Sequence, residues 1–157
     1  MDNFTLTDRT FCKLVKSIHT NKKVTHIKDK GHGNSMTPFL RTGEILFIRP
    51  VNLKGLIRIG DIIALTDNKE EKIIIHRVIN KKNDLFQIKG DNCKNSDGWF
   101  QKKSIIGVVS KKMKLSGKII SFKRWENLLI AFLSKTGLLN SIVLPVGRLV
   151  KKKLQRL

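Results

Sequence analysis

The chain has 157 residues, enough for one domain with a modest core and an appended element. Its apolar content of 40% lies well above the range of disordered proteins, so a folded domain is expected. The formal net charge is +20, and residues 111–157 hold 12 Lys or Arg against one acid, Glu126. This basic tail indicates an anionic partner, either nucleic acid or a phospholipid surface.

The residue types that commonly bind metals are dispersed. Cys12 and Cys93 have neither the spacing of a metal site nor that of a redox motif. The four histidines are too scattered to form a zinc pattern. The sequence therefore predicts no metal and no cofactor.

Residues 1–30 are predicted to form an N-terminal helical or irregular segment. A short amphipathic helix is expected there, with Thr7 or Asp8 as its N-cap. Its apolar face consists of Phe11, Leu14, Val15 and Ile18. Charged residues interrupt this stretch throughout, so no apolar run reaches the length of a signal peptide.

Residues 31–115 contain five short runs rich in β-branched residues, punctuated by Gly, Asp, Asn or Pro. The runs are EILFIRPV, GDIIALT, KIIIHRVIN, DLFQIKG and SIIGVVSKKMKL. No helix-length periodicity separates them, which argues against a βαβ fold. The sequence predicts a mainly β fold, a compact and mainly antiparallel β domain.

Residues 116–157 return to helical periodicity and are predicted to form a basic tail of amphipathic helices. In GKIISFKRWENLLIAFLSK, the apolar residues on one side are Ile119, Phe122, Trp125, Leu129 and Phe132. Gly137 is expected to close this helix, and Pro145 to end one helix or begin another.

Residues 128–146 form a stretch of 19 residues, near the lower limit of about 17 to 25 for a membrane span. Lys135 near its middle would cost about 2.5 to 3.5 kcal/mol on insertion. The composition favours interfacial helices on an anionic membrane, with a true span or ordinary packing on the β domain as alternatives. We therefore expect peripheral membrane association, on an unassigned side, with a cytoplasmic location as the alternative.

GHGNSMTPFL, residues 31–40, places Ser35 in a loop that could expose a nucleophile. A catalytic serine needs a tight bend, N–H donors for the oxyanion, and a base. Gly33 permits the bend, Pro38 fixes the backbone after the serine, and Met36 can bury itself to anchor the loop. Taken alone, such a cluster is more typical of an ordinary loop.

Two further stretches carry candidate residues. Strand alternation puts His76 on the face of Ile74 and Val78, where the simplest interpretation is a partly buried histidine with one hydrogen bond. KGDNCKNSDG contains Asp91 and Asp97, and an Asx-rich hairpin turn would explain its composition unaided.

The order of these stretches resembles the catalytic domain of type I signal peptidases and their relatives. GNSMTPFLRTGE, IGDIIAL, IIIHRVI, IKGDN and IIGVV follow one another over roughly residues 31–110. In that superfamily a Ser-Met-x-Pro box carries the nucleophile, a Gly-Asp pair opens the next strand, and the base precedes an Arg. A Gly-Asp-Asn box and a Gly-Val strand follow. Each box alone is weak, whereas five in order are specific.

His76 before Arg77 is similar to the archaeal and endoplasmic-reticulum branch, which uses a Ser-His pair supported by an aspartate. The common bacterial enzymes and the related self-cleaving repressors have a lysine there. The resemblance implies Ser35 as nucleophile, His76 as general base, and Asp97 as the residue that orients the imidazole, with Asp91 as the alternative. Histidine titrates near neutral pH, so such a base needs no deep burial.

The resemblance also implies supporting roles for Gly60, Asp61, Arg77, Gly90 and Asn92. Three departures accompany it. Gly33 stands where many signal peptidases have a hydroxyl residue, so the oxyanion hole would consist of the Ser35 backbone N–H and the Asn34 side chain. Glu44 replaces the more usual aspartate after Gly43. The membrane span expected before the serine is missing.

The leading hypothesis is a serine endopeptidase of the signal-peptidase type. It would cleave pre-proteins or leader peptides after a small residue through an acyl-enzyme, held at an anionic membrane by its basic helices. A second hypothesis is a cytoplasmic peptide-processing or self-cleaving regulatory peptidase. A third is a non-catalytic nucleic-acid-binding protein, which is disfavoured because 6% aromatic content and no Tyr leave few stacking platforms.

Overall fold

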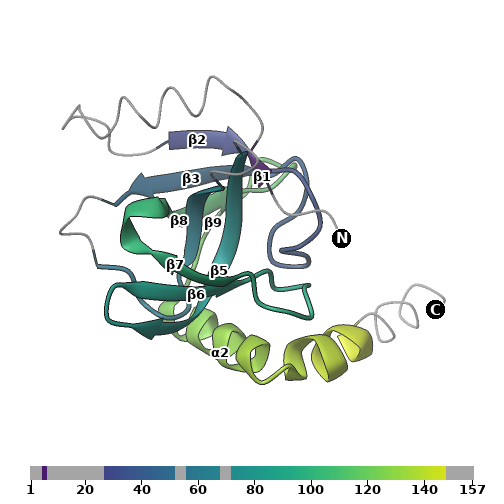
Figure 1. The fold of residues 1–157 in the computed structure, drawn as a ribbon. Helices are drawn as coiled ribbons and strands as arrows, with labels where there is room; N and C mark the ends of the chain where they lie inside the picture. The colour runs from purple at the N-terminus through teal and green to yellow at the C-terminus, as the bar shows by residue number, and fades with distance from the viewer. Residues whose placement is uncertain (1–4, 7–26, 52–55, 68–71, 148–157) are drawn as a thin grey trace.

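The computed structural model describes residues 5–6, 27–51, 56–67 and 72–147. Across these residues the chain is mainly β, with two short helical segments toward the C-terminus (Figure 1). The helix predicted to follow Thr7 or Asp8 lies outside the described residues.

One antiparallel sheet contains all nine strands of the described part. Seven run across it in the order β2-β3-β8-β4-β5-β6-β7, while β1 pairs with β5 and β9 pairs with β8. The bounds are β1 Thr5–Leu6, β2 Ile27–Lys30, β3 Ile45–Pro50, β4 Ile62–Asp67, β5 Lys72–Lys82, β6 Leu85–Lys89, β7 Gly98–Gln101, β8 Ile105–Met113 and β9 Ile119–Ser121. A 3₁₀ turn at Lys102–Ser104 joins β7 to β8.

The five predicted strands are confirmed as β3, β4, β5, β6 and β8. The helix predicted to include Ile119 is wrong at its start, because β9 pairs with β8 there and α2 begins only at Arg124. The turn between β8 and β9 contains Gly117 with a φ of 80°, and Lys114 N–H donates to the Lys118 carbonyl. This hairpin and the adjacent β-branched residues favour a strand over the first turn of a helix.

Two apolar clusters form the core, and successive residues of the central strands alternate between them. On β5, Ile73 and Ile75 belong to one cluster, whereas Ile74 and Val78 belong to the other. Since neighbouring strand residues point to opposite faces, both faces of the sheet are covered. This explains why β5 is a nearly continuous apolar run.

Helix α2, Arg124–Lys135, lies below β5 and β6 in the view of Figure 1. Gly137, with a φ of 78°, follows its end as predicted. A second helical segment covers residues 138–147 and includes π-helical turns over Leu139–Val143. Pro145 lies inside this segment and does not end it. Proline has no N–H to donate, and the π turns just before it end with the Leu144 N–H donating to the Leu139 carbonyl.

Residues 128–146 therefore fall on two helical segments that are separated at Gly137. Within the part of the chain that the structure describes, no helix has both the length and the apolar character needed to cross a membrane.

The backbone of α2 passes directly against Gly60, which has a φ of 96°. A Cβ at Gly60 would lie 2.9 Å from the carbonyl carbon of Asn127. We expect Gly60→Ala to lower the free energy of unfolding by about 2 to 4 kcal/mol, since the backbone strain adds to displacement of α2. Urea denaturation measures the loss.

Gly117→Ala is the matched control for this substitution. Gly117 has a φ of 80°, and a Cβ there would meet no atom within 4 Å. Gly117→Ala should lower the free energy of unfolding only through backbone strain, by about 1 to 2 kcal/mol. Equal losses in the two variants would contradict the close packing of α2 on Gly60.

Candidate active site

Ser35, His76 and Asp97 form a continuous hydrogen-bonded array. Ser35 Oγ lies 2.7 Å from His76 Nε2, and His76 Nδ1 lies 2.7 Å from Asp97 Oδ2. Ser35 and His76 are fully buried, so the prediction that this loop exposes the serine is wrong, whereas the Asp97 side chain is 26% exposed. An ionised carboxylate only accepts hydrogen bonds, so Nδ1 carries the imidazole proton. Nε2 is then the acceptor for the Ser35 hydroxyl.

The loop that carries Ser35 is closed by tight turns and anchored in the core. Thr37 N–H donates to the Asn34 carbonyl at 3.1 Å, and Leu40 N–H donates to the Met36 carbonyl at 2.9 Å. Met36 is fully buried in one apolar cluster, as the sequence predicts. The peptide bond between Thr37 and Pro38 is cis. Ser35 is thus fixed by its neighbours on both sides.

Gly33 adopts a φ of 103°, the bend that its sequence position predicts. The Thr42 side chain, which sequence analysis missed, stabilises this bend. Its hydroxyl donates to the Gly33 carbonyl at 3.0 Å, and Gly33 N–H donates to Thr42 Oγ1 at 3.1 Å. Asn34 is exposed next to Ser35.

The loop between β6 and β7 forms the other wall of the site. Asn92 N–H donates to the Ser35 carbonyl at 2.7 Å, and the Asn92 side-chain amide donates to the Asn34 carbonyl at 3.3 Å. A Cβ at Gly90 would lie 2.8 Å from the Ser35 carbonyl oxygen and 3.0 Å from His76 Nε2. Only glycine therefore lets this loop approach the Ser35–His76 pair so closely.

Asp91 lies away from the imidazole and pairs with Arg77. Its two carboxylate oxygens accept from Arg77 Nε and Nη2, each at 2.8 Å, and both side chains are fully buried. Arg77 Nη1 also donates to the Gly60 carbonyl and to Asn127 Oδ1, each at 2.9 Å. Of the two aspartates, the structure places Asp97 against the imidazole of His76 and Asp91 against the guanidinium.

Asn127 is a further residue that sequence analysis missed. It projects from α2 toward Arg77, 50 residues away in the chain. Helical periodicity identified only apolar positions in this segment, so no local signal marked a polar contact. The long-range packing of α2 on Gly60 creates it.

Asp61, beside Gly60, is a partly buried carboxylate at the entry to β4. Its Oδ2 accepts from Arg58 N–H at 2.8 Å, and its Oδ1 lies 3.7 Å from Arg124 Nη1. Burial raises the pKa of Asp61 above 3.8, and the Arg58 N–H and the Arg124 guanidinium only partly oppose this. Asp61 therefore links the start of β4 to the start of α2.

Two ionisable side chains near the array have shifted pKa values. Burial lowers the pKa of Lys89, whose ammonium donates to the Ser134 carbonyl at 2.8 Å. Burial, and then the Asp97 carboxylate, raise the pKa of the Cys93 thiol. The raised pKa keeps the Cys93 thiol protonated near neutral pH.

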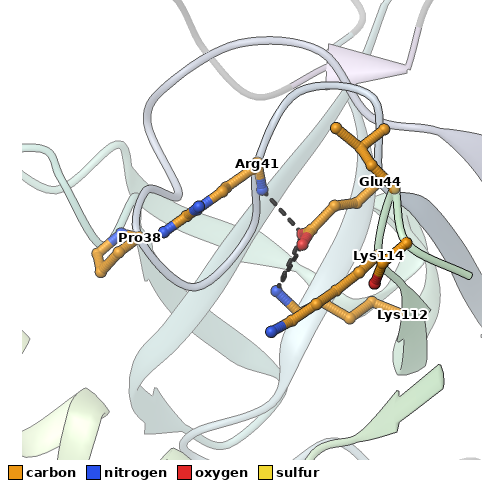
Figure 2. A pocket seen from close by; sticks show the side chains of 7 residues that line it. Pro38, Arg41, Glu44, Lys112 and Lys114 are labelled. Carbon is orange, nitrogen blue, oxygen red and sulfur yellow. Dashed lines mark hydrogen bonds and ion pairs between the residues drawn. The ribbon is translucent and has the colours of Figure 1, made fainter. Parts of the chain in front are cut away.

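A buried ion pair holds the far end of the Ser35 loop (Figure 2). Lys112 Nζ lies 2.9 Å and 3.0 Å from the two oxygens of Glu44, and it also donates to the Phe39 carbonyl. Arg41 N–H donates to Glu44 Oε2 at 3.0 Å. Glu44 and Lys112 are 3% and 6% exposed. The pair ties the loop to β8, beside a pocket of about 280 Å³ that Pro38 also lines.

Among the residues with described positions, no group of three or more His, Cys, Asp or Glu side chains could hold a metal ion. A comparison of the chain with protein-family models gave no match, and a comparison with curated proteins gave none either. The assignment of function therefore depends on the geometry of the site and on the order of its motifs.

Lys112→Met is expected to lower the free energy of unfolding by about 3 to 5 kcal/mol, because the Glu44 carboxylate would stay buried without its cation. The double variant Lys112→Met/Glu44→Gln should recover most of that loss. Urea denaturation at pH 7 gives both values. Lys123→Met is the control, since Lys123 lies 3.8 Å from Glu126 in an exposed pair and should change stability by less than about 1 kcal/mol. Equal losses in the single and double Lys112 variants would contradict a buried pair.

Asp61→Asn tests the raised pKa. The folded protein holds the Asp61 proton more tightly than the unfolded chain, so the stability from this group is full below about pH 4. It is lost as the pH rises through the raised, folded-state pKa. The stability of Asp61→Asn relative to the unsubstituted chain should therefore increase between pH 4 and pH 7 in urea denaturation. A decrease in this relative stability over the same pH range would mean that the Arg124 charge lowers the pKa of Asp61 more than burial raises it.

Proposed function

We propose that this protein is a serine endopeptidase in which Ser35 is the nucleophile and His76 the general base. One observation carries the proposal: the array of Ser35, His76 and Asp97, joined by two contacts of 2.7 Å. A buried serine needs only one hydrogen-bond partner, so the contact with His76 alone could be purely structural. The Asp97 carboxylate makes the array more specific, because it accepts from Nδ1 and so leaves Nε2 free of a proton and able to accept one from Ser35.

In the proposed reaction, Ser35 Oγ attacks the carbonyl carbon of the scissile peptide while its proton moves to His76 Nε2. The Asp97 carboxylate stabilises the imidazolium that forms. The tetrahedral intermediate collapses when Nε2 gives this proton to the leaving amine, which departs and leaves an acyl-enzyme. Water, deprotonated by His76, then attacks the ester and releases the acyl product and the Ser35 hydroxyl.

The negative charge of the tetrahedral intermediate needs hydrogen-bond donors beside Ser35. The donors that we assign are the Ser35 backbone N–H and the Asn34 side chain, which is exposed at this point of the loop. The Thr42 hydroxyl is engaged with the Gly33 backbone and is not assigned this role. One missing donor typically costs about 3 to 4 kcal/mol of transition-state stabilisation, which favours a slow enzyme.

The order of the motifs supports a peptidase of the signal-peptidase type, in the branch with a Ser-His pair. The geometry adds physical reasons for three of the motif residues. Gly90 allows close approach to His76, Asp91 neutralises Arg77, and Asn92 holds the Ser35 carbonyl. The proposed substrate is an extended segment of a pre-protein or leader peptide with a small residue before the scissile bond.

The test is digestion of a mixed peptide library by the purified full chain, with cleavage products identified by mass spectrometry. Ser35→Ala should abolish cleavage, and His76→Gln should lower its rate by roughly 10³-fold or more. Ser96→Ala is the matched control, because Ser96 is exposed in the same loop as Asp97 and should leave the rate unchanged. Cleavage by Ser35→Ala at the full rate would falsify the mechanism.

The two aspartates give a second readout in the same assay. Asp97→Asn should reduce the rate by roughly 10² to 10⁴-fold with little loss of stability, because an amide favours the wrong imidazole tautomer. Asp91→Asn should mainly destabilise the fold, since the buried Arg77 would lose its counter-charge. If Asp97→Asn retained the full rate, the role of Asp97 would be excluded.

A further inference from the structure

Helix α2 buries its polar side and exposes its apolar side. The residues that it buries are Asn127, Ala131 and Ser134. Its large apolar residues Trp125, Leu128, Leu129 and Phe132 are 63%, 41%, 51% and 62% exposed. At about 100° per residue, these four fall within one arc of roughly 100° on the helix surface. The stripe is thus continuous, and it lies mainly on the side of α2 that the sheet does not cover.

The second helical segment extends this stripe. Leu138, Ile142, Val143 and Val146 are 41%, 53%, 43% and 51% exposed, while Leu139 and Leu144 face inward. Both segments lie along one edge of the molecule in Figure 1. We call these eight exposed residues of the two segments the apolar helical face. Exposed apolar residues gathered on neighbouring helical segments often mark an interaction site.

The sheet beneath α2 requires this orientation. Arg77 Nη1 needs the Asn127 side chain, and Lys89 Nζ needs the Ser134 carbonyl. Rotating α2 to bury its apolar stripe would leave the buried guanidinium and ammonium groups without these acceptors, which is costly. The exposure of the α2 part of the apolar helical face is therefore a stable property of the fold.

Charge indicates what covers this face. Arg124 and Lys135 flank the stripe on α2, and Lys123 precedes it with a side chain that is 68% exposed. Residues 111–157 carry a net charge of +11, with Glu126 as their one acid. Two copies of the chain joined through this face would place these charges together and repel each other. An anionic surface would be attracted, and an exposed tryptophan is typical of a membrane interface.

We propose that the apolar helical face inserts into the interface of an anionic phospholipid bilayer, with both helical segments lying in the membrane plane. This inference does not depend on the proposed peptidase activity. An apolar groove of about 440 Å³ links the face to the Ser35 loop, since Trp125 and Leu129 line it together with Phe39. Docking through the face would therefore hold the Ser35 loop beside the lipid surface.

The test is flotation of the full chain with vesicles of phosphatidylcholine alone and of phosphatidylcholine with phosphatidylglycerol. We expect binding to the anionic vesicles that weakens as salt rises. Trp125→Ser/Phe132→Ser should lower the partition coefficient by at least about tenfold, because two large apolar groups no longer insert. Leu115→Ser is the matched control, since Leu115 is 79% exposed outside both helical segments and should leave binding unchanged.

A second measurement keeps the test independent of how the double variant folds. In a Trp99→Phe chain, Trp125 is the sole tryptophan, and its emission should shift to the blue when anionic vesicles are added. No shift, equal binding to neutral vesicles, or equal losses in the double variant and in Leu115→Ser would overturn the proposal. So would a dimer in light scattering that the double variant abolishes, because the face would then belong to a second copy.

Discussion

Arg77 brings a full positive charge into the interior, and much of the molecule is arranged around its guanidinium. The two oxygens of Asp91, the Gly60 carbonyl and Asn127 Oδ1 all accept from it, and these groups come from separate parts of the chain. A buried charge that lost such partners would be severely destabilising. The guanidinium therefore fixes where the β6–β7 loop and α2 lie relative to β5. His76 is the residue immediately before Arg77 on the same strand, so its position follows from this arrangement.

The Ser35 loop is held in a different way, by its two ends and by one apolar anchor. Thr42 closes the bend at Gly33, the Glu44–Lys112 pair ties the loop to β8, and Met36 is buried between. Catalysis by a serine depends on such prior positioning, because the donors and the base must be in place before charge develops. Three separate contacts thus hold this loop, and none of these three involves the Ser35 hydroxyl.

The sequence predicted the five central strands well, because β-branched runs bounded by turn residues are a strong local signal. It was less informative where the outcome depends on distant partners. Helical spacing placed Trp125 and Phe132 on one face of a helix. It did not predict that this face points outward, because the orientation of α2 depends on its contacts with buried cations of the sheet. Asp91 and Asp97 lie in one polar loop, where local composition does not distinguish them; the resemblance favoured Asp97 beside His76, and the buried Arg77 takes Asp91 as its partner. Short apolar runs such as Ile119–Ser121 fit either a helix or a strand.

The contact between Asn127 and Arg77 has a thermodynamic consequence. Asn127 lies on the inner side of α2 and four residues of the apolar helical face lie on its outer side, so a single twelve-residue helix connects the two surfaces. A ligand that binds α2 only when it is seated on the sheet adds its binding free energy to the seated state. By linkage, a substrate that binds only the assembled array strengthens the binding of that outer ligand by the same factor. Occupancy of the outer surface would then favour the seated position of α2, and with it the contact of Asn127 with Arg77 beside His76.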